Sequence, residues 1–409
     1  MASQCRFCRA PLRATFVDLG MSPLSNAFIK PELLSAPEKF YPLHAFVCES
    51  CFLVQLEEFE SPDRIFSDYL YFSSYSDSWL SHAKRYCDSA TTRFNLTKDS
   101  FVVEVASNDG YLLKNFVERG IPCLGIEPAA NVAKVAQSKG VPTESVFFGE
   151  ESARQIVSRH RKADLMIANN VLAHVPDINS FVAGFAIALT PSGSVTFEFP
   201  HLLQLIENNQ FDTIYHEHFS YLSLLAVERI VSKHGLKVTE IENLATHGGS
   251  LRVTACHAGA PNRPVHPSVL ETREREKRAG LDRIETYTRF TESVLRTKRA
   301  FLSFLLQAQS EGKGVVAYGA AAKGNTLLNF CGVRGDLIQY VVDRNPHKQG
   351  TYLPGTRIPV FAPERIAGTK PHYVVILPWN LRDEVSEQLS SIRSWGGHFV
   401  VPIPTLQVF

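Results

Sequence analysis

Residues 101–127 read FVVEVASNDGYLLKNFVERGIPCLGIE, and this stretch decides the fold. The apolar run 101–105 predicts a buried strand, 106–110 a turn and 111–119 a helix. A second strand is expected over 122–126. Strand, turn, helix and strand in this order open a doubly wound α/β domain.

The ends of these two strands carry the features of a nucleoside site. Glu127 ends the second strand, roughly twenty residues beyond the turn, where a carboxylate binds ribose hydroxyls in dinucleotide folds. The turn lacks the G-x-G-x-x-G fingerprint, and Asp109 beside it would repel a pyrophosphate. A nucleoside without phosphate is therefore expected. S-adenosylmethionine fits, because its sulfonium and ammonium cations are attracted to the carboxylates of Glu104 and Asp109.

A third strand is expected over 164–168, and a further strand over 194–199. The third strand ends in Asn169 and Asn170, at the carboxyl edge where open α/β sheets bind ligands. Together these elements resemble the class I S-adenosylmethionine-dependent methyltransferases. The expected cofactor contacts are Glu104, Ser107, Asn108, Asp109, Gly110, Glu127, Asn169 and Asn170.

Two C-x-x-C pairs begin the chain: Cys5 with Cys8, and Cys48 with Cys51. Each pair can hold two thiolates on one tight turn, so two such turns offer the tetrahedral sulfur shell that Zn²⁺ prefers. A site filled by four protein ligands is expected to be structural. Redox C-x-x-C motifs are the alternative.

Length and charge bound the class of protein. The chain has 409 residues, more than one hydrophobic core usually serves, so two or three domains are expected. Its 42 basic and 41 acidic side chains argue against nucleic acid or an anionic membrane as partner and favour a small molecule. No signal segment and no membrane-spanning apolar run are evident, so a reducing cytoplasm is expected, with a monomer or weak oligomer.

The densest cluster of ionisable groups is Tyr215, His216, Glu217 and His218, just before an expected apolar helix. The histidines are two residues apart, which does not match the H-x-x-x-H spacing of a helical zinc site. A solvated or helix-capping turn would explain the cluster. A catalytic imidazole explains it better, because histidine gains and loses a proton near neutral pH.

A second α/β unit is expected after a charged helical stretch over 271–310. Its first strand, 314–318, leads into a turn of small residues, 319–324, whose backbone N–H groups can face an anion. With Lys323 this turn could hold a diphosphate, although an ordinary strand-to-helix connection fits it equally well. The expected substrate contacts here are Tyr318, Gly319, Lys323, Asn325, Thr326 and Asp343.

Two further groups are candidates for substrate contact. His247 and Arg252 flank a Gly248-Gly249 pair that also fits an ordinary turn. Three tyrosines, Tyr69, Tyr71 and Tyr75, precede an expected helix and would either pack or face a polar ligand.

In their order along the chain, these motifs resemble the three-domain sugar C-methyltransferases that act on nucleotide-linked keto-deoxysugars. The motifs are the paired C-x-x-C, EVASNDG at 104–110, the 169–174 stretch, YHEH at 215–218, THGGSLR at 246–252 and YGAAAKGNT at 318–326. The resemblance implies that the carbon next to a ketone is deprotonated and methylated from S-adenosylmethionine, with a structural zinc. By match of motif, the implied base is His218, and the implied residues around the sugar are Tyr215, Glu217, His174 and one tyrosine of the 69–75 stretch, either Tyr69, Tyr71 or Tyr75.

The same resemblance covers essentially the whole chain and implies three domains. These are a zinc-binding module (1–66), a methyltransferase domain (67–262) and a Rossmann-like, nucleotide-sugar-binding domain (263–409). The expected substrate is a nucleoside-diphosphate keto-sugar, with thymidine diphosphate as the expected nucleotide. The alternatives are O- or N-methylation of a nucleotide-sugar, which needs no carbon acid, and a non-catalytic nucleotide-sugar binding protein. An NAD oxidoreductase is a third, weakened by the missing fingerprint.

Overall fold

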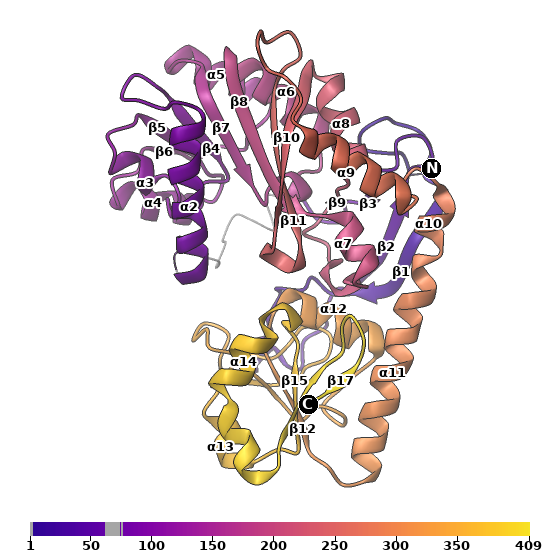
Figure 1. Cartoon of the computed structure of the whole chain (residues 1–409). Helices are drawn as coiled ribbons and strands as arrows, with labels where there is room; N and C mark the ends of the chain where they lie inside the picture. The colour runs from indigo at the N-terminus through magenta and orange to yellow at the C-terminus, as the bar shows by residue number, and fades with distance from the viewer. Residues whose placement is uncertain (1–2, 62–73, 75–76) are drawn as a thin grey trace. The chain divides into compact units, whose positions relative to one another are not determined.

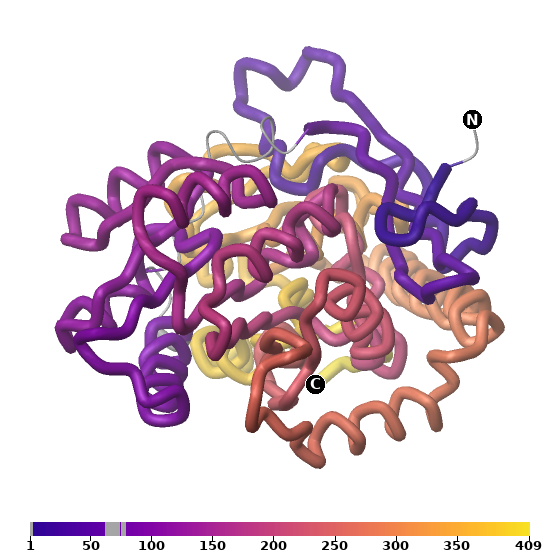
Figure 2. The backbone as a smooth tube through the Cα atoms, turned by 90° about the horizontal axis from the view of Figure 1, so that it is seen from above, coloured from indigo at the N-terminus to yellow at the C-terminus, as the bar shows by residue number. Residues whose placement is uncertain are grey.

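The computed structural model describes residues 3–61, 74 and 77–409 (Figure 1). Contacts within the chain divide it into two compact units, each assembled from three segments. The first unit comprises Met1–Leu12, Cys48–His201 and Phe219–Asp282, and the second comprises Arg13–Val47, Leu202–His218 and Arg283–Phe409. The path of the chain through these segments can be followed as a backbone tube in Figure 2. The three domains expected from the sequence stay a prediction.

The first unit is built on a seven-stranded sheet of order β10-β11-β8-β7-β4-β5-β6. Strands β8 to β6 in this order are parallel, and β10 and β11 add an antiparallel edge. A short antiparallel pair, β3 with β9, lies outside this sheet. The strands are β3 (Val54–Leu56), β4 (Val102–Val105), β5 (Cys123–Ile126), β6 (Thr143–Glu144), β7 (Ala163–Asn169), β8 (Leu189–Pro200), β9 (Ser220–Tyr221), β10 (Leu236–Leu244) and β11 (Ser250–His257).

Helices cover both faces of this sheet. The helices are α2 (Asp77–Arg93), α3 (Lys114–Val117), α4 (Ala130–Ser138), α5 (Glu150–Arg159), α6 (Ile178–Ala188), α8 (Leu224–Lys233) and α9 (Pro267–Arg278), with 3₁₀ turns η3 (Leu172–His174) and η5 (Thr246–Gly248). Neighbouring residues of β8 show the two faces. Thr196 bonds Tyr86 of α2 at 2.7 Å, whereas Phe197 packs edge-to-face on Phe185 of α6.

The order of strands places a switch point in the first unit between β4 and β7. From β4 the chain runs outward through β5 and β6, then returns to β7 and β8 on the other side. The turns after β4 and β7 therefore flank a crevice at the carboxyl edge, where α/β sheets bind ligands.

The second unit contains a six-stranded sheet of order β14-β13-β12-β15-β16-β17, parallel except for β17. An antiparallel pair, β1 with β2, packs through Phe16, whose ring stacks on Phe290 at 4.6 Å between centroids. The strands are β1 (Ala14–Ser22), β2 (Tyr41–Val47), β12 (Val315–Tyr318), β13 (Val341–Val342), β14 (Val360–Phe361), β15 (Tyr373–Ile376), β16 (His398–Val401) and β17 (Gln407–Val408).

The helices of the second unit are α7 (Leu202–Glu207), α10 (Ile284–Thr288), α11 (Phe290–Ser310), α12 (Ala322–Cys331), α13 (Arg365–Thr369) and α14 (Arg382–Gln388), with 3₁₀ turns η1 (Pro31–Leu33), η4 (Phe211–Thr213), η6 (Trp379–Leu381) and η7 (Ser390–Trp395). Its switch point lies between β12 and β15, because β13 and β14 extend the sheet one way and β15 and β16 the other.

The predicted α/β architecture is confirmed, and the differences are local. The helix expected over 111–119 is α-helical only over Lys114–Val117, and the side chain of Asn115 donates to the carbonyl of Leu112 at 2.8 Å. Such side-chain bonds compete with regular helix. The charged stretch 271–310 is divided into α9, α10 and α11, with Gly280 at φ 82° in the first break.

Candidate functional site

Four thiols of the first unit converge on one point. The Sγ atoms of Cys5, Cys8, Cys48 and Cys51 all lie within 4.8 Å of one another. Cys5 is 3.5 Å from Cys51, and Cys8 is 3.5 Å from Cys48. Thiolates bound tetrahedrally to Zn²⁺ at about 2.3 Å lie roughly 3.8 Å apart, so the four sulfurs fit that ion. The amide of Gln55 donates to Sγ of Cys5 at 3.2 Å, as outer hydrogen bonds do around zinc ligands.

Both cysteine pairs are folded in the same way. The backbone N–H of Arg9 donates to the carbonyl of Cys5 at 2.9 Å, and that of Phe52 donates to the carbonyl of Cys48 at 2.8 Å. Arg9 and Phe52 are both left-handed, at φ 65° and 61°. Two like turns therefore present the thiols, and all four ligand positions belong to the protein.

The turn after β4 requires unusual backbone angles. Ala106, Asn108 and Gly110 have φ of 56°, 51° and 77°. A Cβ on Gly110 would lie 2.9 Å from a methyl carbon of Val141, so no side chain fits there. The turn therefore packs tightly against the neighbouring βα unit.

The side chain of Glu127 contacts this turn. Its carboxylate accepts hydrogen bonds from the backbone N–H groups of Asn108 and Ala129, each at 2.9 Å. Burial raises the pKa of Glu127, and these two hydrogen bonds oppose the rise. Each carboxylate oxygen has a second lone pair, so Glu127 keeps the capacity to accept the predicted hydrogen bonds from ribose hydroxyls.

Carboxylates outnumber cations at this edge. Burial, followed by the charges of Glu127 and Asp109, raises the pKa of Glu104 well above its usual range. Lys139 is the partner of Asp109, with Nζ 2.8 Å from Oδ2. A ligand with positive charge would relieve the repulsion between these carboxylates.

Several buried polar atoms at this edge have no hydrogen-bond partner within the described ranges. They are Oε2 of Glu104, Oγ of Ser107, Oδ1 of Asp109, Oδ1 of Asn169, and both side-chain polar atoms of Asn170. Buried polar groups are normally paired. These atoms flank the switch point between β4 and β7, so a polar ligand seated there would satisfy them.

The register of the sheet extends the polar edge sideways. Asn169 is opposite Glu198, Glu198 is opposite Arg252, and Arg252 is opposite Glu242. Residues opposite one another on adjacent strands project to the same face. Four polar residues from β7, β8, β11 and β10 thus form a row beneath α2.

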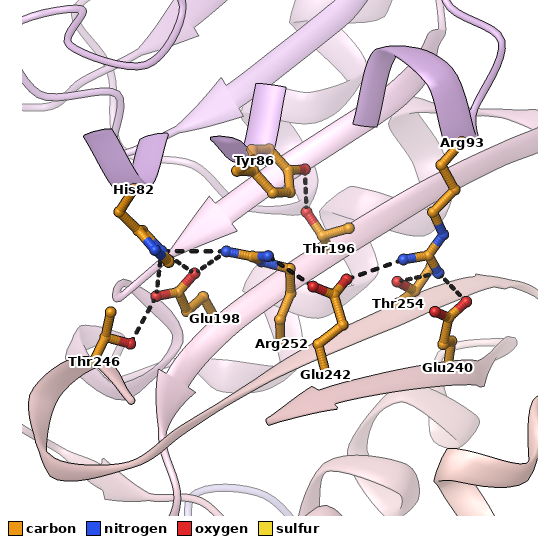
Figure 3. Close-up of polar contacts among 10 residues, drawn as sticks. All are labelled: His82, Tyr86, Arg93, Thr196, Glu198, Glu240, Glu242, Thr246, Arg252 and Thr254. Atoms are coloured by element: carbon orange, nitrogen blue, oxygen red, sulfur yellow. Dashed lines mark hydrogen bonds and ion pairs between the residues drawn. The ribbon is translucent and has the colours of Figure 1, made fainter. Parts of the chain in front are cut away.

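Arg252 is engaged within this row (Figure 3). Its guanidinium donates to Glu198 at 2.7 Å and to Glu242 at 2.9 Å, and it lies 4.6 Å from the ring centre of Tyr86. The Arg252 and Glu198 side chains are 6% and 0% exposed. The predicted substrate contact of Arg252 stays a prediction.

His82 of α2 joins the same network (Figure 3). Its Nε2 lies 3.0 Å from Glu198 and 3.2 Å from the guanidinium of Arg252. A carboxylate only accepts, so the tautomer with a proton on Nε2 donates to Glu198. Guanidinium also only donates, so its approach to Nε2 is not a hydrogen bond in that tautomer. Burial raises the pKa of Glu198, but the hydrogen bond from His82 and the charge of Arg252 outweigh burial and hold that pKa below its usual range.

Sequence reasoning missed His82 and Glu198. The available signal was a glutamate inside the strand predicted over 194–199. Two predicted residues lie nearby in the fold. His247 has φ 55° in η5 beside Thr246, which donates to Glu198 at 3.2 Å, and His174 is half-buried at the end of η3 after β7.

In the second unit, the Tyr215–His218 segment separates into two pairs. The half-buried rings of Tyr215 and His218 are 4.0 Å apart between centroids. Nδ1 of His218 lies 2.9 Å from the carbonyl oxygen of Thr213. A carbonyl only accepts, so Nδ1 carries the proton and Nε2 carries the lone pair of the neutral ring.

The other two residues of the segment are buried. Nε2 of His216 lies 3.1 Å from the carbonyl of Pro42, and burial lowers the pKa of His216. Both carboxylate oxygens of Glu217 accept from the amide of Asn26, each at 2.9 Å. Burial raises the pKa of Glu217 to about 6, and the Asn26 hydrogen bond opposes that rise.

The turn after β12 lies at the switch point of the second sheet. Gly319 has φ 93°, and a Cβ there would lie 2.5 Å from Cδ of Pro378, so glycine is required. Nζ of Lys323 donates to Asn380 at 2.7 Å and lies 4.6 Å from the ring centre of Trp379. Burial lowers the pKa of Lys323.

The other residues predicted in this unit differ in their surroundings. Tyr318 lines a cavity of about 550 Å³ together with Arg344. Asp343 accepts backbone N–H groups from Ala320 at 2.7 Å and from Asn345 at 2.8 Å.

Asn325 and Thr326 lie deeper in α12. Both are buried, and they donate to the backbone carbonyls of Ser25 and Ile214, at 2.6 and 3.0 Å. Tyr69, Tyr71 and Tyr75 lie outside the described residues. The substrate contacts proposed for all these residues stay predictions.

A sheet with a parallel core, this switch point and a carboxylate-rich edge has the features expected of an S-adenosylmethionine-dependent methyltransferase. Family models agree. Residues 5–66 match a zinc binding domain, 79–241 a methyltransferase domain, and 245–404 a C-methyltransferase C-terminal domain.

The whole chain has a characterised counterpart. C-methyltransferase NovU of Streptomyces niveus is 36% identical over 405 residues, which cover 99% of this chain and 96% of that protein. The chain therefore belongs to the zinc-binding, S-adenosylmethionine-dependent C-methyltransferase family, and the predicted family, cofactor and zinc are confirmed. Within the described residues, no helix combines the length and apolar character needed to cross a membrane.

Similarity to solved structures is weaker. The PH0226 protein of Pyrococcus horikoshii has a TM-score of 0.38 at 14% identity, covering 49% of this chain and 99% of that one. Magnesium protoporphyrin IX methyltransferase of Synechocystis has a TM-score of 0.33 at 14% identity, covering 48% and 88%. These scores are too low to bear on function.

Proposed function

We propose that this C-methyltransferase acts on the carbon next to the ketone of a nucleoside-diphosphate keto-deoxysugar, with His218 as the base. The observation that carries the proposal is the hydrogen bond between Nδ1 of His218 and the carbonyl of Thr213, at 2.9 Å. It fixes the tautomer in which Nε2 can accept a proton.

Carbon methylation requires a carbon nucleophile. In the proposed reaction, the C–H proton passes to Nε2 of His218, and the electron pair of that bond forms the new bond to the methyl carbon. S-adenosylmethionine would supply this methyl group from its positively charged sulfur. The S–CH₃ bond would break with its electron pair left on sulfur, which releases S-adenosylhomocysteine. The phenol of Tyr215, whose ring packs on His218, would donate a hydrogen bond to the oxygen that gains negative charge.

The buried carboxylate of Glu217 is proposed to bind a hydroxyl or amine of the sugar. Its elevated pKa of about 6 suits a group that holds or releases a proton near neutral pH. His174 and Tyr69 are proposed as further residues around the sugar, and Tyr71, Tyr75, His247 and Arg252 as further substrate contacts.

The nucleotide part is proposed to bind at the carboxyl edge of the second sheet. Lys323 and the backbone after Gly319 would hold the diphosphate, with Tyr318, Asn325, Thr326 and Asp343 nearby. The location of this turn at a switch point supports the assignment. Thymidine diphosphate as the nucleotide, the division at residues 66 and 262, and a monomeric or weakly associating state belong to the same proposal.

The test is incubation with S-adenosylmethionine and a panel of thymidine- and other nucleoside-diphosphate keto-deoxysugars. Mass and proton spectra are expected to show a new methyl group on carbon. Without S-adenosylmethionine, the enzyme is expected to exchange the proton next to the ketone for solvent deuterium.

His218→Asn is expected to slow both exchange and methyl transfer by about 10²-fold or more. The matched control is His216→Asn, which removes a buried imidazole from the same segment. This control is expected to lower the melting temperature while the folded protein still catalyses exchange. Undiminished exchange by folded His218→Asn protein would show that His218 is not the base.

A further inference from the structure

The side chain of Asn26 contacts Glu217 of the 215–218 segment, although the two residues are far apart in sequence. Its Nδ2 lies 2.9 Å from each carboxylate oxygen of Glu217, which is 191 residues away along the chain. Glu217 is 6% exposed, so water has little access to this carboxylate. An ionised carboxylate only accepts hydrogen bonds, and the amide NH₂ group of Asn26 only donates.

The backbone just before Asn26 is held in place within the second unit. The carbonyl of Ser25 accepts from the buried amide of Asn325 at 2.6 Å. A side chain on Gly355 would place its Cβ 2.9 Å from Pro23, so the chain is closely packed there. Asn26 is therefore presented from a fixed segment, which lowers the entropy lost in holding its partner.

We propose that Asn26 is a positioning residue for methyl transfer, which orients the Glu217 carboxylate and favours its ionised form. The inference rests on the proposed function, in which Glu217 contacts the sugar. Asn26 itself is assigned no contact with the substrate.

The electrostatics of the pair support this role. Burial raises the pKa of Glu217, and the hydrogen bond from Asn26 lowers it. Two titratable residues adjoin Glu217 in sequence: His216, against the Pro42 carbonyl, and His218, against the Thr213 carbonyl and the Tyr215 ring. Without the Asn26 donor, burial is opposed less, and the pKa of Glu217 is expected to rise by about one to two units.

The test follows the protonation of Glu217 directly. Infrared spectra of the full-length protein are recorded across pH, and the carboxyl band of Glu217 is isolated by difference from Glu217→Gln protein. Asn26→Ala is expected to raise the midpoint by about one to two pH units. Asn26→Asp keeps the side-chain volume but places a carboxylate opposite Glu217, and at least the same shift is expected.

The matched control is Ser25→Ala, which alters the neighbouring side chain and keeps the backbone bond to Asn325. Its midpoint is expected to equal that of the wild type. Circular dichroism melting shows which variants are folded. If Asn26→Ala is not folded, Asn26→Asp is used for the test in its place. An unchanged midpoint in a folded Asn26 variant would overturn the inference.

Kinetics separate this inference from the proposed function. On the panel member that accepts a methyl group, the acid limb of kcat/KM is expected to move upward with the Glu217 midpoint, because activity requires the ionised carboxylate. If the acid limb of kcat/KM does not move in the Asn26 variants while Glu217→Gln abolishes activity, the role of Asn26 is refuted and the role of Glu217 is not. Full activity of Glu217→Gln refutes the role that the proposed function gives to Glu217.

Discussion

Removing one partner from the buried ion pair of the first unit should destabilise that unit strongly. In Arg252→Met, the carboxylate of Glu198, which is 0% exposed, keeps His82 and Thr246 as its side-chain partners among the described residues. Breaking a buried pair in this way typically costs about 3–5 kcal/mol. That is a large part of the total stability of a domain, roughly 5–15 kcal/mol.

The measurement is calorimetric melting of the zinc-loaded protein, with attention to the transition of the first unit. For a unit of this size, each kcal/mol shifts the melting temperature by roughly 2–4 °C, so a fall of about 6–20 °C is expected. The control is Arg273→Met, which breaks a pair with Glu228 whose side chains are 46% and 21% exposed. That pair should contribute about 0–1 kcal/mol.

A second variant tests the mechanism of the loss. Arg252→Met combined with Glu198→Leu removes both charges, and replacing a whole buried pair by apolar groups is often neutral. The double variant is therefore expected to melt above the single one. If Arg252→Met melts like Arg273→Met, or if the double variant melts as low as the single one, the assignment of an uncompensated buried charge is wrong.

Two further predictions concern the cofactor and the metal. Glu104→Gln is expected to weaken the binding of S-adenosylmethionine roughly 10- to 150-fold. The binding of S-adenosylhomocysteine should weaken much less, because that ligand lacks the sulfonium charge. Titration calorimetry with both ligands measures the two affinities, and equal losses would contradict the prediction. Since burial and neighbouring carboxylates raise the pKa of Glu104, binding of the cationic ligand should release protons, and binding should weaken as pH falls through that pKa. Cys8→Ser or chelation should lower zinc content and the melting temperature while the remaining folded enzyme keeps its rate; loss of rate before any unfolding would mean that the metal is not structural.

The parts of the fold that the sequence predicted are those written in local patterns. Mostly apolar runs such as 101–105 and 164–168 correspond to β4 and β7, because parallel strands buried on both faces need no alternation. The polar residues that follow these strands are predicted to be neighbours because the carboxyl ends of parallel strands meet at one edge of the sheet.

The unpredicted contacts are those that depend on register between distant segments. The sequence around Arg252 does not predict that Arg252 lies opposite Glu198, because that pairing is fixed only when β11 pairs antiparallel with β8. The partnership of Asn26 with Glu217 is of the same kind. Likewise, the sequence gathers His216 and His218 into one cluster, whereas packing buries the first and leaves the second half-buried.

The segmented construction of the two units has a consequence for how the protein is made. The chain passes from one unit to the other after residues 12, 47, 201, 218 and 282. During synthesis, the first unit lacks its last segment until residue 282 has left the ribosome, and the second contains pieces from near both ends of the chain. Neither can be produced by simple truncation, so a nascent polypeptide must keep unpaired strands soluble until translation is nearly finished.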